Sequence, residues 1–297
     1  MIHEKGLVAI TLALASAGQP TEQSARNISP SWSPDGKAIA FVSSRDRNPD
    51  VCVLRLEGWE RSTVVGDETV DLGVRWRPDG AALSFVSRRD GGNDLYLVSL
   101  EGGELERLTE RGDVLAAGHA WSPDGTKIVY AAGPHTDANL FVVEVESGKV
   151  TQLTHTDAMD AAPSWSPDGE KIAFQSKRTG NFEIFTMALD GTSLAQLTDD
   201  PAEDGQPVWS PDGERIAFLS YRDGNAEVYV MKADGSKPVN LTGNAASDSG
   251  PSWSPDGERI AFSSDRHGKQ NEIFLMRADG SYPARLTEGL EATHARK

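Results

Sequence analysis

The chain of 297 residues carries 45 acidic against 29 basic side chains, a formal net charge of −16. This balance excludes ordinary nucleic-acid binding, because phosphate backbones are held by clusters of Lys and Arg, and it favours a basic protein patch or a metal cation as partner. A hydrophobic fraction of 38% is typical of a globular protein, no apolar run reaches the roughly 18 residues of a membrane span, and the single Cys52 excludes an internal disulfide.

Residues 1–27 precede the first repeat and admit two interpretations. Lys5, the apolar stretch 7–15 and the small residues Ala15-Ser16-Ala17 have the form of a secretory signal with its cleavage site, which predicts a periplasmic or secreted protein. The alternative is a cytoplasmic protein in which residues 7–12 add an extra strand at the edge of the fold. Both hypotheses stay open at this point.

A tryptophan recurs six times at almost constant spacing. The six are Trp32, Trp76, Trp121, Trp165, Trp209 and Trp253, separated by 44, 45, 44, 44 and 44 residues. Ser-Pro-Asp-Gly follows five of them, and Arg77-Pro78-Asp79-Gly80 follows Trp76. Pro presets φ for the second turn position and Gly tolerates the positive φ of the exit, so each tetrapeptide predicts a strand reversal. Six copies at this period predict a repeat array.

Each unit contains four predicted strands, of which the fifth unit is a clear example. After its turn come alternating apolar residues around Ile216 and Phe218, then a polar loop, then the apolar run 228–231, then a second turn at Asp234-Gly235 and a short strand ending at 241–242. β-Branched and aromatic residues favour strand over helix, and four strands per unit make a propeller blade. The sequence therefore predicts an all-β, six-bladed propeller over residues 28–287, with a tail at 288–297. Closure of the ring is expected to rest on packing of the first blade against the last, unless the N-terminal segment supplies a strand.

The pattern Asp-x-x-Pro-x-Trp-Ser-Pro-Asp-Gly is intact at residues 160–169, 204–213 and 248–257. It resembles the WD-like repeat of the TolB propeller family, over about 260 of the 297 residues. The resemblance implies a non-catalytic propeller that binds a protein or peptide. It covers the propeller domain alone, since TolB carries an α/β domain ahead of its blades and 27 residues precede them here. Related propellers also serve in prolyl-oligopeptidase-type peptidases and polysaccharide lyases.

In such a blade, the turn between the first two strands and the turn between the last two share one face, which we call the turn face. The loops between the second and third strands and the connections between blades share the other, which we call the loop face. The loops on the loop face vary between units, and binding groups usually sit on loops held by a rigid scaffold. Function is therefore expected on the loop face, around the central channel.

Five units carry an Arg 13 residues after the Trp and an acid at the start of the third strand. The pairs are Arg45 with Asp50, Arg89 with Asp94, Arg178 with Glu183, Arg222 with Glu227, and Arg266 with Glu272. The third unit has Pro134 and Asn139 in these positions, so it lacks both partners together. This joint loss predicts an ion pair that braces the loop between the second and third strands.

Acidic residues gather on the loop face. Asp71, Asp160, Asp204 and Asp248 lie five residues before their Trp, in positions taken by Asn27 and Ala116 in the other two units. The carboxylates can pair with the Arg set and cap backbone donors, or their summed field can steer a basic partner. We expect an acidic binding surface at the channel mouth. No cofactor is predicted, with calcium or another divalent cation at the mouth as the alternative.

The third unit departs most from the repeat and carries His119, His135 and His155 in or near its loops. These histidines nominate it as a binding region. No Gly-x-Ser-x-Gly elbow, His-Glu-x-x-His or Walker loop is present, which favours a non-catalytic protein. The predicted partner is a protein or peptide with a basic patch, bound by a monomer. The alternative is a propeller enzyme, such as a polysaccharide lyase or a metal-dependent hydrolase that uses these histidines.

Overall fold

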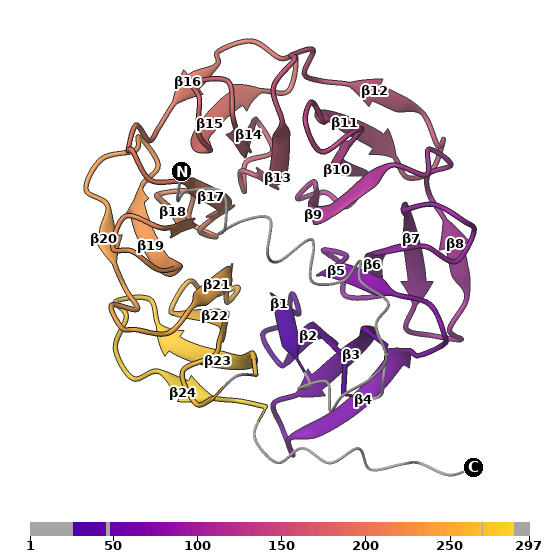
Figure 1. The fold of residues 1–297 in the computed structure, drawn as a ribbon. Coiled ribbons are helices and arrows are strands. Elements are labelled where there is room, and N and C mark those ends of the chain that lie inside the picture. Colours follow the sequence, from indigo (N-terminus) through magenta and orange to yellow (C-terminus); the bar gives the residue numbers. More distant parts are fainter. Residues whose placement is uncertain (1–25, 46–47, 269, 288–297) are drawn as a thin grey trace, which may run out of the picture.

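The computed structural model describes residues 26–45, 48–268 and 270–287, which form a disc of six four-stranded blades around a central axis (Figure 1). Blade 1 holds β1 (Asn27–Trp32), β2 (Ala38–Ser43), β3 (Asp50–Arg55) and β4 (Glu60–Val65), and blade 2 holds β5 (Asp71–Trp76), β6 (Ala82–Ser87), β7 (Asp94–Ser99) and β8 (Leu105–Arg107). Blade 3 holds β9 (Val114–Trp121), β10 (Lys127–Ala132), β11 (Asn139–Glu144) and β12 (Val150–Gln152), and blade 4 holds β13 (Asp160–Trp165), β14 (Lys171–Ser176), β15 (Glu183–Ala188) and β16 (Ala195–Gln196). Blade 5 holds β17 (Asp204–Trp209), β18 (Arg215–Ser220), β19 (Glu227–Lys232) and β20 (Val239–Asn240), and blade 6 holds β21 (Asp248–Trp253), β22 (Arg259–Ser264), β23 (Glu272–Arg277) and β24 (Ala284–Arg285). Within each sheet the strands are antiparallel and follow chain order, so the predicted six-bladed propeller is confirmed.

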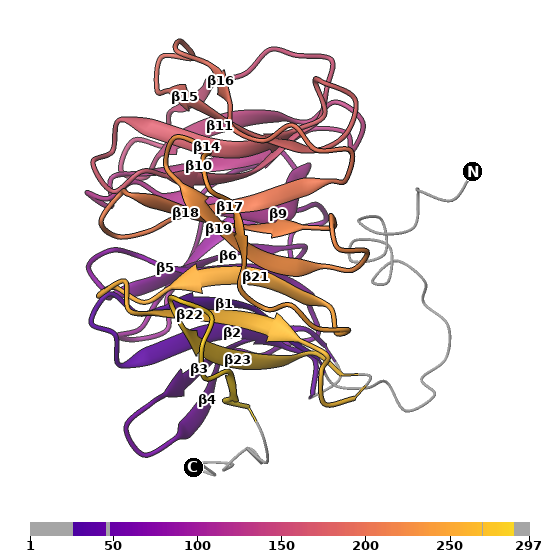
Figure 2. The ribbon, with the colours of Figure 1, turned by 90° about the vertical axis from the view of Figure 1, so that its left-hand side faces the viewer.

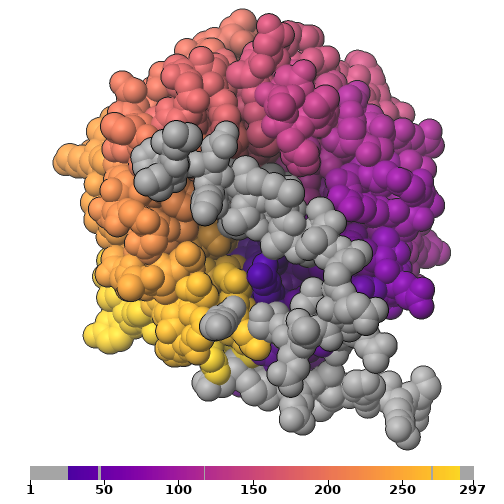
Figure 3. Space-filling model, viewed as in Figure 1, coloured from indigo at the N-terminus to yellow at the C-terminus, as the bar shows by residue number. Residues whose placement is uncertain are grey.

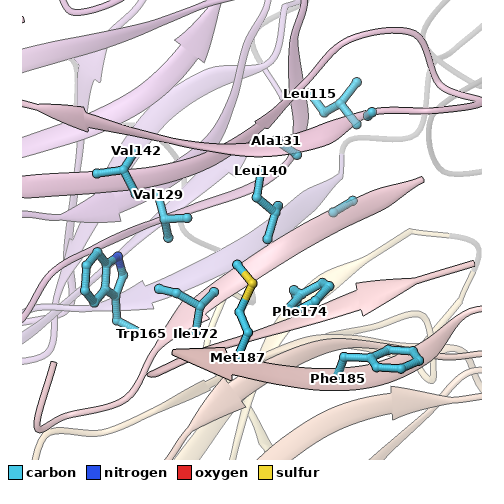
Figure 4. Close-up of a cluster of buried hydrophobic side chains, with 12 residues drawn as sticks. Leu115, Val129, Ala131, Leu140, Val142, Trp165, Ile172, Phe174, Phe185 and Met187 are labelled. Carbon is cyan, nitrogen blue, oxygen red and sulfur yellow. The ribbon is translucent and has the colours of Figure 1, made fainter. Parts of the chain in front are cut away.

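The middle strands of each blade are apolar on both faces because neighbouring sheets cover both. Ile216, Phe218 and Val228 of blade 5 are fully buried, whereas Val239 on its outermost strand is exposed. Figure 4 shows one such interface, in which Val129 and Leu140 of blade 3 pack toward blade 4. This sandwiching explains why the second and third strands read as nearly continuous apolar runs instead of alternating ones.

The Ser-Pro-Asp-Gly turn is stabilised by its own side chains. In blade 5 the Ser210 hydroxyl donates to the Asp212 carboxylate and accepts from the Arg215 N–H at 3.0 Å. The Gly213 N–H donates to the Ser210 carbonyl at 2.9 Å, with Gly213 at φ 71°. The Ser210 hydroxyl also lowers the pKa of Asp212 below its usual value. The contacts that define the turn lie within six consecutive positions, residues 210–215, which is why sequence spacing predicts it well.

Replacing Ser210 with alanine is expected to lower the free energy of unfolding by about 1–2 kcal/mol at neutral pH, because buried turn donors and acceptors lose their partner. A carboxyl with a depressed folded-state pKa contributes stability that is present above its unfolded pKa and lost as pH falls through the folded pKa. The difference between wild type and variant should therefore narrow on acidification below the ordinary Asp pKa of 3.8. Urea unfolding across a pH series, with the exposed Ser247→Ala as control, measures this; a constant difference would contradict it.

The ring closes without an exchanged strand among the described residues. The Asn27 N–H of blade 1 donates to the Asn271 carbonyl of blade 6 at 2.8 Å, the same bond that the Asp204 N–H makes to the Phe182 carbonyl between blades 4 and 5. Apolar residues of the two blades also form one cluster: Trp32, Ile39, Phe41, Cys52 and Leu54 from blade 1 with Ala261, Ile273 and Leu286 from blade 6. Figure 2 shows the two blades side by side at the edge of the disc. Closure by packing is what these residues support, while the predicted strand at 7–12 and the predicted signal lie outside the described residues.

A β-bulge interrupts the first strand of every blade, close to the channel. In five blades the register with the second strand shifts around the third residue of the first strand, and blade 3 shifts between Tyr130 and Ala132 of its second strand. The bulged residues have positive φ: Ser29, Gly73, Gly118, Ala162, Gln206 and Gly250. Bulges re-aim side chains and bend a strand. These six form the inner wall of the disc, and no expectation from the sequence anticipated them.

Candidate functional site

The channel on the propeller axis encloses a cavity of about 490 Å³. Residues of the six first strands line it, together with side chains from the loop face such as Arg88, Asn93 and His135. Its wall includes apolar and aromatic groups from several blades: Ile28, Leu72, Leu115, Trp76, Trp121, Trp165 and Trp209. Among the described residues, no Asp or Glu lines it. Figure 3 shows the hollow at the centre of the disc, beside the indigo residues at the start of blade 1. The channel itself is therefore not acidic.

The four repeated aspartates lie inside the blades. Asp71, Asp160, Asp204 and Asp248 have side chains with no exposed area, and each pairs with the arginine 18 residues later in the same blade. The distances between guanidinium nitrogen and carboxylate oxygen are 3.1 Å for Arg89–Asp71, 3.0 Å for Arg178–Asp160, 2.6 Å for Arg222–Asp204 and 2.9 Å for Arg266–Asp248. A partner cannot touch these carboxylates without opening a blade. Pairing with the arginines, which the sequence left as an alternative, is what the structure shows.

The predicted pairing of these arginines with the acids of the third strands is therefore wrong in four blades. Ser220 lies opposite both Asp204 and Glu227 in the sheet, so either carboxylate is within the reach of Arg222 by register. Glu227 is already occupied, because it accepts from the Thr242 hydroxyl, from the Asn244 N–H at 3.0 Å and from Asn225 at 2.8 Å. Asp204 is left for the guanidinium. The corresponding acids Asp94 and Glu183 likewise accept from Thr109 and Thr198 near the end of the fourth strand.

The arginine also stacks on two aromatic rings. The guanidinium of Arg222 lies 5.8 Å from the ring centre of Phe218 and 4.9 Å from that of Tyr229, while its Nε donates to the Ser220 hydroxyl at 2.8 Å. The same contacts recur in blades 2, 4 and 6. Burial raises the pKa of Asp204, and the Ser220 and Arg222 donors oppose that shift. We interpret the Ser-Arg-Asp group as a structural element of the repeat.

Blades 1 and 3 lack the Arg–Asp pair of the other four blades and form other ion pairs. In blade 1, where Asn27 replaces the aspartate, Arg45 pairs with Glu272 of blade 6 at 3.0 Å. In blade 3, which lacks the arginine, Arg111 from the preceding connection stacks on Phe141 at 4.3 Å and pairs with Asp113 at 3.0 Å. Loss of the arginine in blade 3 is thus compensated by a neighbour.

Exposed carboxylates on the loop face lie on the connections between blades. They are Asp67, Glu68, Glu110, Asp157 and Asp199. Two of these connections, those of Asp67 and Asp157, also carry residues that line the cavity, Val70 and Met159. The structure thus leaves exposed carboxylates on the loop-face connections and none on the channel wall, in the described part of the chain.

The three histidines do not come together. His119 is buried, with its Nε2 2.6 Å from the Ser84 hydroxyl oxygen, which also accepts from Trp121 Nε1 at 2.8 Å. Burial lowers the pKa of His119 to about 3, assisted by the nearby charge of Arg75, so its imidazole is neutral. His135 lines the channel mouth and His155 is exposed elsewhere in the loops. No group of three His, Cys, Asp or Glu side chains within residues 26–45, 48–268 and 270–287 is placed to hold a metal ion.

Arg75 lines the cavity and was not among the residues predicted for the site. The position directly before the repeated Trp is Ser31, Arg75, Ala120, Ser164, Val208 and Ser252 in the six blades, and Arg75 is the single charged member. Arg75 follows the bulge of β5 and lines the cavity. Comparison of the six copies at this position is the signal that would have found it.

Comparison with known proteins agrees with this architecture. The family model for the TolB beta propeller domain matches residues 7–119, 114–204 and 196–295. A structure assigned as TolB from Agrobacterium tumefaciens is 27% identical, with a TM-score of 0.70 over 84% of this chain and 90% of the other. TolB from Acinetobacter baumannii is 22% identical, with a TM-score of 0.71 over 93% of this chain and 66% of the other. Among curated proteins none matches the chain.

More distant structures share the fold alone. An oligogalacturonate lyase in complex with manganese is 18% identical, with a TM-score of 0.63 over 88% of this chain and 77% of the other. The propeller domain of the Trilobed protease from Pyrococcus furiosus, described as having an open velcro topology, is 13% identical with a TM-score of 0.63, covering 94% of this chain and 100% of the other. In the described part of the chain, no helix long and apolar enough to cross a bilayer occurs. The family match over most of the sequence shows that the chain belongs to the TolB β-propeller domain family.

Proposed function

We propose that this protein is a non-catalytic binding module that takes a segment of a protein or peptide at the loop-face mouth of its central channel. The observation that carries the proposal is the channel cavity of about 490 Å³, whose wall combines apolar and aromatic surface with a few polar groups. Such a composition is typical of ligand sites, where apolar contacts supply affinity and sparse polar groups fix orientation. Membership of the TolB family supports a binding role and the predicted location outside the cytoplasm.

The partner segment is proposed to carry basic residues next to the part that enters the channel. We propose that exposed carboxylates on the loop-face connections, such as Asp157 and Asp199, form an acidic rim that contacts these residues. Rim charges act mainly on the rate of association and on specificity, and their effect falls with salt. The apolar wall would then hold the inserted side chains.

Panning a random peptide library displayed on phage against the protein tests the proposal. Peptides recovered on wild type are expected to bind at least about tenfold more weakly to Ala116→Trp, because this small lining residue faces the cavity and an indole there would fill the mouth. An unchanged melting temperature confirms that the variant is folded. Recovery of no saturable binder, or of peptides that bind both proteins equally, would overturn the channel as the site.

The rim is tested with the same peptides by Asp157→Lys/Asp199→Lys. The matched control is Glu170→Lys/Glu214→Lys, which makes the same charge change at exposed positions on the turn face. The rim variant should bind basic peptides more weakly and with less dependence on salt, whereas the control should behave as wild type. Equal behaviour of the two variants would refute a specific role for the acidic rim.

A further inference from the structure

Arg75 is a cavity-lining arginine at the end of β5 that has no carboxylate partner among the described residues. Its Nη1 donates to the carbonyl of the neighbouring residue Val74 at 2.8 Å, and no Asp or Glu of the described residues forms an ion pair with it. Arg89 of the same blade, by contrast, is 3.1 Å from Asp71. A guanidinium carries five N–H donors, so most of the donors of Arg75 remain for another acceptor.

The surroundings of Arg75 make an uncompensated charge costly. The residue is partly buried and lines the channel cavity beside Trp76, and its close neighbour His119 is a buried, neutral imidazole. Burial lowers the pKa of Arg75 to about 10, which still leaves it protonated at neutral pH. Charged side chains that are largely withdrawn from water are normally paired, because the lost hydration must be replaced. A charge kept in this position without an internal partner indicates a partner that comes from outside.

We propose that Arg75 anchors an anion subsite in the channel, which binds a carboxylate of the inserted ligand. This inference rests on the proposed function and adds the chemistry of the group that enters deepest. A planar guanidinium matches a carboxylate with two parallel hydrogen bonds, and the apolar and aromatic groups of the wall strengthen them. The same wall and the acidic rim disfavour a doubly charged phosphate, whose desolvation cost is higher. The carboxylate is either the C-terminus of the peptide or an acidic side chain within it.

The site does not depend on the geometry of one loop. Arg75 lies at the end of β5, two residues after the bulge at Gly73, where an added Cβ would meet the Ala116 carbonyl of blade 3 at 3.0 Å. The bulge is thus held by the next blade, so the guanidinium projects from a rigid wall. Sites built on such elements are more sharply positioned than sites on mobile loops.

Intrinsic tryptophan fluorescence tests the subsite directly, since Trp76 and Trp121 line the same cavity. The probes are N-acetylglycine and its neutral counterpart N-acetylglycinamide, with sodium chloride matching the ionic strength. A saturable change with N-acetylglycine, absent with the amide and at least about tenfold weaker in Arg75→Met, is expected. Arg75→Lys should be intermediate, because an ammonium keeps the charge without the bidentate geometry. No response of wild type to N-acetylglycine, or an equal response in Arg75→Met, would overturn the subsite.

A stability measurement separates this role from a structural one. In the absence of ligand, Arg75→Met should melt at the same temperature as wild type or higher, since it removes an unpaired charge, whereas Arg222→Met should melt lower. A comparable loss of melting temperature in both variants would mean that Arg75 is structural and would also overturn the proposal.

The library peptides then separate the two proposals. Peptides that bind wild type and Arg75→Met equally, with free or amidated C-termini, would support the binding function and contradict the carboxylate subsite. An Arg75-dependent response to N-acetylglycine without any channel-bound peptide would support the carboxylate subsite and contradict the peptide-binding function.

Discussion

Arg222→Met is expected to lower the free energy of unfolding by about 3–5 kcal/mol, because it leaves the Asp204 carboxylate buried without its charged partner. The Asp204 side chain has no exposed area and lies 2.6 Å from the guanidinium. Loss of stacking on Phe218 and Tyr229 adds to the effect. Chemical denaturation followed by tryptophan fluorescence measures the difference.

The control for this variant is Lys149→Met. Lys149 and Glu144 form an ion pair at 3.9 Å whose side chains are 69% and 40% exposed, and exposed pairs contribute at most about 1 kcal/mol.

A double-mutant cycle identifies the carboxylate partner of Arg222. Arg222→Met combined with Asp204→Asn should show a coupling of about 0.5–3 kcal/mol, and the coupling with Glu227→Gln should be smaller. A larger coupling to Glu227 would restore the pairing expected from sequence and refute the one described here.

Glu272→Ala is expected to loosen the ring where its two ends meet, with a loss of about 2–4 kcal/mol. Glu272 accepts from Asn27 at 2.7 Å and from Arg45 at 3.0 Å, both in blade 1, and from the Thr287 hydroxyl. Asn27 is buried, so its amide would lose its charged acceptor, while Arg45 is partly exposed and is stabilised by water to some extent. No covalent connection joins blades 1 and 6 at this interface, so these contacts matter more here than elsewhere.

Glu183→Ala is the matched control, because Glu183 holds the same position in blade 4 and accepts from Asn181, Thr198 and the Asp200 N–H of its own blade and connection. Hydrogen exchange should speed up in β1 and β24 for Glu272→Ala, and around β15 and β16 for Glu183→Ala. Equal exchange at the seam in both variants would show that Glu272 has no special part in closure.

Local chemistry made the architecture readable from the sequence. The Trp spacing and the Pro-Asp-Gly turn predict six blades because the turn needs contacts among consecutive residues only, such as Ser210, Asp212 and Gly213. The apolar runs predict strands covered on both faces, because side-chain direction alternates along any strand and a continuous run places apolar side chains on both sides. These features do not depend on contacts with distant parts of the chain.

Only the tertiary structure decided where the charges go. Arg222 lies five residues from Glu227 and 18 from Asp204, so proximity in sequence favours Glu227, the wrong partner. Sequence distance does not show that Thr242 and Asn244, from the fourth strand and its connection, already donate to Glu227. Likewise the blades bury the repeated aspartates against their arginines, and Arg75, after the bulge of β5, lines the channel. The repeated aspartates, which the sequence assigned to an acidic channel mouth, are thus buried inside the blades. Arg75 places a positive charge without a carboxylate partner in the channel. Burial and pairing depend on which side chains from distant strands compete for the same atoms, and spacing along one chain does not record that competition.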